Sequence, residues 1–195
     1  MKRTLLSFVV VVSLGCDLLP NANADNISKP SISRKDSITV RTFLDSNGLF
    51  ELDVHDVVRD DANGVPVIGI GSVSIDTITL VAELSSLPDL CQLIFVGNID
   101  LCGIRVSPDF HPSKDLEIAL NANNFTQVPL ELLTVPKIKT INLMFNQIST
   151  LPPEIMSRPD LELLIRYNRI CQLPDSIAEF MDQNDSLWRL GQECL

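Results

Sequence analysis

The sequence has few aromatic and histidine residues and little positive charge. Aromatic side chains make up 5% of the 195 residues, and His55 and His111 are the two histidines. So small a set leaves little room for a histidine-based metal centre or general base. Lys and Arg number 15 against 25 Asp and Glu, for a formal net charge of −10. Because phosphates and anionic lipids attract basic surfaces, this balance argues against a nucleic-acid partner and against an anionic membrane surface.

The sequence also lacks an apolar run long enough to cross a bilayer. The run Leu5–Leu14 has 10 residues, whereas a membrane-spanning helix needs about 20. Lys2 and Arg3 precede this run, and a basic start followed by a short apolar core is typical of a signal peptide. We therefore expect the protein to be exported.

The sequence leaves two positions open for the cleavage of the leader. Ala22-Asn23-Ala24 is an A-x-A cleavage site, which makes the signal peptide residues 1–24. Ser13–Cys16 resembles a bacterial lipobox, which makes the signal residues 1–15 and Cys16 the lipidated residue. The protein is then secreted, periplasmic or an outer-surface lipoprotein, and any contact with a membrane runs through the lipid at Cys16.

Catalytic motifs are missing from the sequence. It contains no G-x-S-x-G, no H-E-x-x-H and no Walker glycine loop. His55 and His111 lie far apart along the chain, so a joint catalytic role is not expected. We predict that the protein is not an enzyme and has no metal or cofactor. A hydrolase is the third class of function, and the sequence offers no set of catalytic residues for it.

Cysteine usage agrees with export. Besides Cys16 there are four cysteines, which allow three connectivities, and none has C-x-x-C spacing. An even set in an exported protein is typical of a disulfide framework. We predict the two local pairs, Cys91–Cys102 and Cys171–Cys194; the alternative is four buried free thiols.

An internal repeat occupies the middle of the chain. The residues Ile141, Leu143, Asn146, Ile148, Leu151, Pro152 and Ile155 find matching residue types 23 positions earlier and again 22 positions later. A fixed period of this length is typical of repeat architectures. Within each copy, apolar residues two apart indicate a short strand with its apolar side chains on one face. The asparagine after the strand has an amide that can bond the turning backbone of the neighbouring copy.

The segment 138–160, IKTINLMFNQISTLPPEIMSRPD, resembles a 23-residue leucine-rich repeat, L-x-x-L-x-L-x-x-N-x-L-x-x-L-P-x-x-I, of the kind found in bacterial exported proteins. The resemblance implies an α/β repeat solenoid: a short arc with a concave parallel β-sheet, an N-terminal helical cap and a C-terminal cap. It divides the mature chain into the N-terminal cap (25–66), the leucine-rich repeats (67–170), and the last repeat return with the C-terminal cap (171–195).

The caps have their own signals. Ile38, Val40, Phe43 and Leu44 have helical spacing from Asp36 onward, and Asn47-Gly48 is a typical helix stop. At the other end, Ile177, Phe180 and Met181 have helical spacing. We expect Trp188 and Leu190 to fold back over the last repeat, with Trp188 as a core residue of the cap.

The outward positions of the predicted strands supply the candidate binding site. Because side chains alternate along a strand, the residues beside the buried Leu and Ile point away from the core. The candidates are Ile94, Asn121, Asn142, Met144, Phe145, Leu164, Arg166 and Tyr167. Aromatic residues, Arg and Met are enriched at protein interfaces. The alternative is that Phe145 and Tyr167 cover the sheet edge or pack under the C-terminal cap.

We therefore predict a non-enzymatic protein-binding module that is exported or surface-anchored and holds a protein partner on the concave face. That function follows from the family resemblance, because fold alone does not determine function. The alternative is a structural or envelope protein without a discrete ligand.

Overall fold

The computed structural model describes residues 32–60 and 66–194. The expected leader, with both cleavage sites and Cys16, lies outside these residues. The helices are α1 (Arg34–Ser46), α2 (Val54–Val57), α3 (Leu130–Leu133) and α4 (Asp175–Asn184), with 3-10 turns η1 (Ala82–Ser86) and η2 (Pro153–Ser157). The strands are β1 (Val58–Asp60), β2 (Pro66–Gly71), β3 (Thr77–Leu80), β4 (Gln92–Val96), β5 (Gly103–Val106), β6 (Leu116–Ala119), β7 (Ile138–Asn142) and β8 (Glu162–Leu164).

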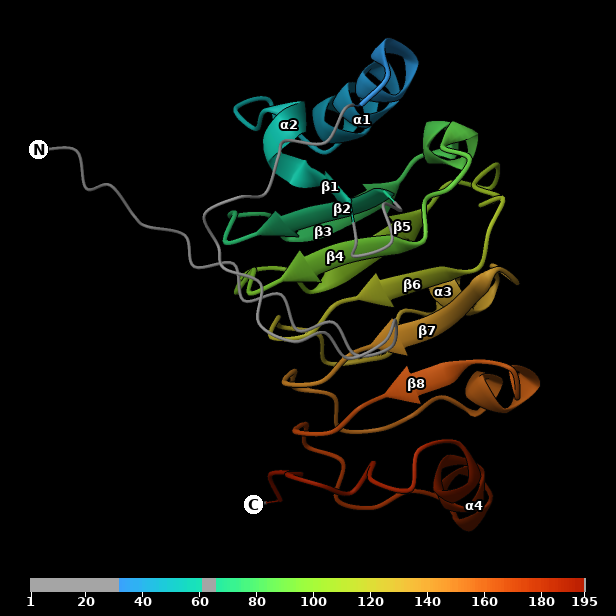
Figure 1. The fold of residues 1–195 in the computed structure, drawn as a ribbon. Coiled ribbons are helices and arrows are strands. Elements are labelled where there is room, and N and C mark those ends of the chain that lie inside the picture. The colour runs from blue at the N-terminus through green and yellow to red at the C-terminus, as the bar shows by residue number, and fades with distance from the viewer. Residues whose placement is uncertain (1–31, 61–65, 195) are drawn as a thin grey trace, which may run out of the picture.

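The described strands form two sheets. The larger has the order β1-β2-β4-β6-β7-β8, and β3 pairs with β5 in the smaller. β1 is antiparallel to β2, and all other neighbours are parallel. Figure 1 shows the strands of the larger sheet stacked in that order, with α1 and α2 at one end and α4 at the other. The protein is thus an α/β fold with a mostly parallel sheet and few helices, which confirms the predicted fold class at this level.

The strand register brings apolar residues of successive strands side by side. Leu93 pairs with Ile118, Ile118 with Ile141, and Ile141 with Leu163, and all four side chains are buried. The residues two positions further along are also buried: Phe95, Leu120, Leu143 and Ile165. Since side chains alternate along a strand, the residues between them belong to the opposite, outer face of the sheet.

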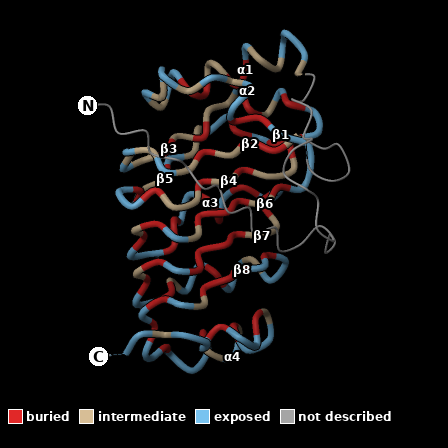
Figure 2. Tube along the Cα trace, turned by 60° about the vertical axis from the view of Figure 1, so that its left-hand side comes forward, coloured by how far each residue is buried: buried red, intermediate tan, exposed pale blue. Residues whose placement is uncertain are grey.

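A single cluster of buried side chains runs through the described chain. It extends from Phe43 in α1 to Trp188 near the C-terminus. Most members are Leu, Ile and Val, but four phenylalanines are among the largest fully buried side chains: Phe43, Phe95, Phe110 and Phe125. Figure 2 shows buried residues at every level from β2 to β8, with exposed residues mostly on the outer turns.

The predicted N-terminal helix is present, and it begins slightly earlier than Asp36. The Ser33 side chain caps α1 by accepting a hydrogen bond from the Asp36 N–H at 3.1 Å. Gly48, at φ +70°, follows the cap residue Asn47 and ends the helix. The Asn47 side chain also accepts from the Thr79 N–H, at 2.6 Å, and so fastens α1 to β3. Of the four apolar residues in this helical spacing, Ile38 is exposed, whereas Val40, Phe43 and Leu44 are buried.

The C-terminal segment closes the opposite end of the core. Ile177 and Met181 of α4 are buried, as their spacing predicts, and Phe180 packs partly against the core. Trp188 is 4% exposed, which confirms its predicted place in the core. Leu190 is half exposed, so its side chain is not a core residue. Leu190 instead contributes its backbone carbonyl, which accepts from the Tyr167 N–H at 2.9 Å.

Candidate functional site

A row of residues with left-handed backbone follows the strands of the larger sheet. It comprises Gly97, Ala122, Phe145, Tyr167 and Gly191, with φ between +57° and +71°. Ser72, which follows β2, has the same conformation at φ 58° but is followed by Val73 and not by a side-chain amide. The N–H groups of Ala122 and Phe145 donate to the carbonyls of Met144 and Arg166, at 3.0 and 3.2 Å. These bonds place consecutive members of this left-handed row next to one another. Glycine is the residue that adopts this conformation readily, so the bulky side chains at Phe145 and Tyr167 are the unexpected members.

Directly after each member of the row stands a side-chain amide. These residues form an amide ladder: Asn98, Asn123, Asn146, Asn168 and Gln192. Asn146 is typical of it, because its oxygen accepts from the Phe125 N–H and its NH₂ group donates to the carbonyls of Leu120, Leu143 and Met144, all at 2.9–3.2 Å. The ladder therefore satisfies buried backbone groups of two neighbouring segments at once.

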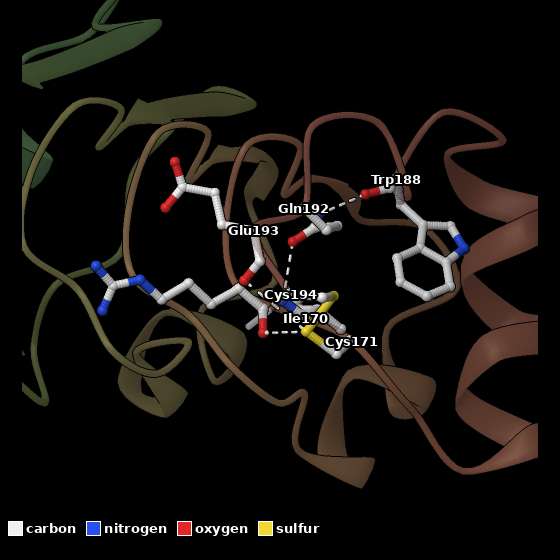
Figure 3. Close-up of a disulfide and its surroundings, with 7 residues drawn as sticks. Ile170, Cys171, Trp188, Gln192, Glu193 and Cys194 are labelled. Atoms are coloured by element: carbon white, nitrogen blue, oxygen red, sulfur yellow. Dashed lines mark hydrogen bonds between the residues drawn. A yellow bond between two sulfur atoms is a disulfide. The ribbon is translucent and has the colours of Figure 1, made fainter.

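Gln192 is a ladder member that the sequence reasoning missed. Its oxygen accepts from the Ile170 N–H at 2.9 Å (Figure 3). Its NH₂ group donates to the Ile165 carbonyl, also at 2.9 Å. The signal was a glycine before an amide residue, Gly191-Gln192, because Gly97-Asn98 has the same form. The pattern was not recognised because this position holds Gln, whereas the other four ladder positions hold Asn.

The rings of Phe145 and Tyr167 stack in the left-handed row. Their centroids are 4.4 Å apart and their planes differ by 4°. Phe145 is 52% exposed and Tyr167 37%. A Cβ placed on Gly191 would lie 2.1 Å from the Tyr167 ring, so that ring packs directly on the Gly191 backbone. Tyr167 thus lies partly under the C-terminal segment, as one alternative expected, whereas half of Phe145 faces solvent.

The other predicted contact residues are less exposed to solvent than Phe145 and Tyr167. Asn142, Met144 and Leu164 are buried, so the expectation that they form an exposed patch with the two rings is wrong. The register explains this for Asn142, which lies between Ala119 and Leu164 on the adjoining strands. Side chains of adjacent strands, about 4.8 Å apart, cover one another.

The remaining predicted residues are half-buried: Ile94, Asn121 and Arg166. Arg166 is turned toward the C-terminal segment, where its Nε donates to the buried Asp185 carboxylate at 3.3 Å. Its charge is therefore compensated within the chain. The exposed part of the predicted patch reduces to Phe145 and Tyr167.

A row of polar side chains, which we call the polar row, crosses the outer face of the sheet. On each strand its member comes one residue before the buried residue of the set Leu93, Ile118, Ile141 and Leu163. The register aligns Gln92, Glu117, Thr140 and Glu162 on adjacent strands. Burial raises the pKa of Glu117, a hydrogen bond with Gln92 opposes that shift, and the negative charge of Glu162 adds to it. Among the residues that the structure describes, neither carboxylate has an ion-pair partner. The sequence reasoning did not single out this row.

One of the two predicted disulfides is present. Cys171 and Cys194 are bonded, with a Cα–Cα distance of 5.4 Å (Figure 3). Cys102 is a free, exposed thiol, so the predicted Cys91–Cys102 disulfide is wrong. The reason is β4, which lies between the two cysteines: its five residues separate its ends by about 13 Å at 3.3 Å per residue.

We expect Cys171→Ser to lower the free energy of unfolding by about 2–4 kcal/mol, because the bond closes a long loop that the unfolded chain otherwise leaves open. The loop spans 23 residues and includes α4 and Trp188. Urea titration followed by circular dichroism measures the change. Cys102→Ser is the matched control, since that thiol is exposed and unbonded. Equal stabilities of the two variants would contradict the prediction.

Within residues 32–60 and 66–194 there is no group of three or more His, Cys, Asp or Glu side chains able to hold a metal ion. No helix in this part of the chain is long and apolar enough to cross a membrane. His55 lies in α2, and His111 follows β5. No protein-family model matches the sequence, and no curated protein matches it.

Proposed function

We propose that the chain is a leucine-rich-repeat protein and that it serves as a non-enzymatic protein-binding module, exported or anchored through Cys16. The larger sheet is the concave face of a short arc, and α1 with α2 and the segment after α4 are its caps. Three observations support this architecture: the 22- to 23-residue sequence period, the strand order along the chain, and the amide ladder. The partner binds at the rim of the concave face, through Phe145 and Tyr167.

The observation that carries the binding proposal is the backbone conformation of these two exposed aromatic residues. Left-handed backbone costs a residue other than glycine about 1–2 kcal/mol, so the two positions together cost about 2–4 kcal/mol. Their stacking contributes about 0.5–1.5 kcal/mol beyond burial. The backbone at these two positions therefore costs more than the ring stacking returns, and glycine, which occupies two positions of the same row, would adopt this conformation more easily. Ser72 and Ala122 bear the same backbone cost, but only Phe145 and Tyr167 place a large apolar ring at such a position. Residues kept against a local folding preference mark functional sites.

Phe145→Gly separates a binding role from a folding role. We expect this variant to unfold at the same or a higher urea concentration than the parent, because glycine relieves the backbone cost. We expect its affinity for the natural partner to fall by about 1–3 kcal/mol, as for other aromatic anchors. The partner is first captured with the exported protein from its own medium or envelope, and affinity is then measured by calorimetry.

Leu130→Ala is the control for this experiment. Leu130 is also an exposed apolar residue, but it lies in α3, off the sheet surface. Its replacement should leave the affinity unchanged. A captured partner that binds the Phe145→Gly variant as tightly as the parent would rule out this face. Capture of no partner at all would favour the structural or envelope role.

A further inference from the structure

The left-handed row contains an unfilled position beside the ring stack. The order along the row is Gly97, Ala122, Phe145, Tyr167, Gly191, and the backbone bonds between neighbouring turns make each residue adjacent to the next. One face of Phe145 is covered by Tyr167 at 4.4 Å. Its other neighbour is Ala122, whose methyl group is too small to cover a ring.

The space above Ala122 is also open on its far side. A Cβ placed on Gly97 would have no atom of the described chain within 4 Å. Neighbouring strands are about 4.8 Å apart, which is close to the spacing of stacked rings. An aromatic side chain laid over Ala122 would therefore continue the Tyr167–Phe145 stack by one ring. We call the space above Ala122 and against Phe145 the ring slot.

The charges on the same face indicate that the partner is basic. Glu117 and Glu162 lie in the polar row, and no described cation pairs with either carboxyl group. The nearby cations are already engaged, because Lys139 donates to Asp160 at 2.5 Å and Arg166 to Asp185 at 3.3 Å.

Arg59 lies in the row on β1, three strands from Glu117, or about 14 Å away at 4.8 Å per strand. It is therefore too far away to compensate either carboxylate. The burial of Glu117 and the repulsion from Glu162 would both be eased by a cation placed between the two carboxylates.

The two features are separated by a length that an extended chain matches. Thr140 stands between Glu117 and Glu162 in the row, and Phe145 comes five residues after it. Because β7 ends at Asn142, Phe145 lies at most about 16 Å from Thr140. Side chains of an extended partner segment alternate between its two sides, so a cation on the polar row and a ring on Phe145 must be an even number of residues apart, and four such residues span about 13 Å.

We propose that the ring slot receives an aromatic side chain of a basic, extended protein segment whose Lys or Arg lies between Glu117 and Glu162. This inference rests on the proposed binding function and specifies the chemistry of its partner. A partner that offers a ring without positive charge leaves the two carboxylates unpaired, and one that offers charge without a ring leaves Phe145 exposed.

The probe is a synthetic peptide in which two Lys stand four and six residues before a Trp, so that all three side chains lie on one side of the extended chain, with Gly and Ser elsewhere. Matched peptides replace Trp with Ala, or both Lys with Glu. Binding to the full chain is measured by fluorescence anisotropy of a dye on the peptide at low salt. We expect each replacement in the peptide to weaken binding at least fivefold, and 0.5 M salt to weaken the parent peptide similarly, because screening removes the charge contribution.

Two protein variants locate the site. Ala122→Leu fills the ring slot with an apolar group that cannot stack, and we expect at least a fivefold loss of affinity. Leu130→Ala removes an exposed apolar side chain in α3, away from the ring slot, so this variant should bind within twofold of the parent and serves as the control. Replacing Glu117 and Glu162 together with Gln should weaken binding of the Lys–Trp peptide and remove most of its salt dependence.

The outcomes separate this inference from the proposed function. Equal affinity of Ala122→Leu and the parent, or equal binding of the Lys and Glu peptides, would overturn the ring slot or its charge preference. Absence of peptide binding, while the natural partner still depends on Phe145, would overturn the basic aromatic segment and leave the binding face in place. A natural partner indifferent to Phe145 would instead overturn the proposed function itself.

Discussion

Replacing Asn146 with Ala should lower the free energy of unfolding by about 3–5 kcal/mol, because several buried backbone groups lose their partner together. The Asn146 side chain accepts one N–H and donates to three carbonyls, and it is 8% exposed. An alanine methyl group replaces none of these bonds, and the space it leaves is too enclosed for water to serve every group equally well. Urea titration monitored by circular dichroism measures the loss.

Asn121→Ala is the matched control for the ladder. Asn121 is the same residue type, stands two positions before Asn123, and is half-buried on the outer face of the sheet. No side-chain hydrogen bond of Asn121 is present among the described residues, so its replacement should cost less than about 0.5 kcal/mol. Similar losses in the two variants would mean that the ladder amides contribute no more than ordinary polar surface.

Trp188→Ala should be the second large loss, about 3–5 kcal/mol, because a large aromatic side chain is removed from the core and leaves a cavity. The ring is 4% exposed, its Nε1–H donates to Asp182 at 2.8 Å, and the Arg189 guanidinium carbon lies 4.3 Å from the ring centroid. Arg189 also bonds Asp182 and, with a smaller contribution from Trp188, holds the pKa of that carboxyl below its usual range. The indole therefore supports both the apolar and the polar contacts of the C-terminal segment.

Leu187→Ala is the control, because Leu187 is the adjacent residue and is half exposed. Trp188→Phe should recover much of the lost stability, since it keeps an aromatic ring in the core but drops the hydrogen bond. Circular dichroism is the suitable probe, because Trp188 is the single tryptophan and its fluorescence disappears with the substitution. A loss below about 1 kcal/mol for Trp188→Ala would show that the last segment packs loosely on the core.

Much of the fold was predictable because short-range patterns govern it. Apolar residues two apart, repeated every 22 to 23 positions, predicted which side chains turn inward, and Ile118, Ile141 and Leu163 do lie in register inside the sheet. The N-terminal helix and the core position of Trp188 were likewise predictable from spacing and residue type. The assignment to leucine-rich repeats and the binding role stay predictions.

The candidate site was predicted only in part, because exposure depends on neighbours that a linear pattern does not reveal. Alternation correctly put Asn142 and Leu164 on the outer face of the strands, yet the adjoining strands cover them. The same limit applies to Arg166, which pairs with Asp185 from the C-terminal segment. The polar row was not predicted, because its members become neighbours only when the strands pair in register.

The sequence by itself determined the inward and outward faces of the strands and the amide at four of the five ladder positions, because each depends on residue type and regular spacing. Only the tertiary structure decided that Cys102 is unbonded, that Gln192 completes the ladder, and that the rings of Phe145 and Tyr167 stack beside an open position at Ala122. These features depend on which segments adjoin and how far apart their backbones lie. That proximity arises from the packing of the whole core, and no local pattern encodes it.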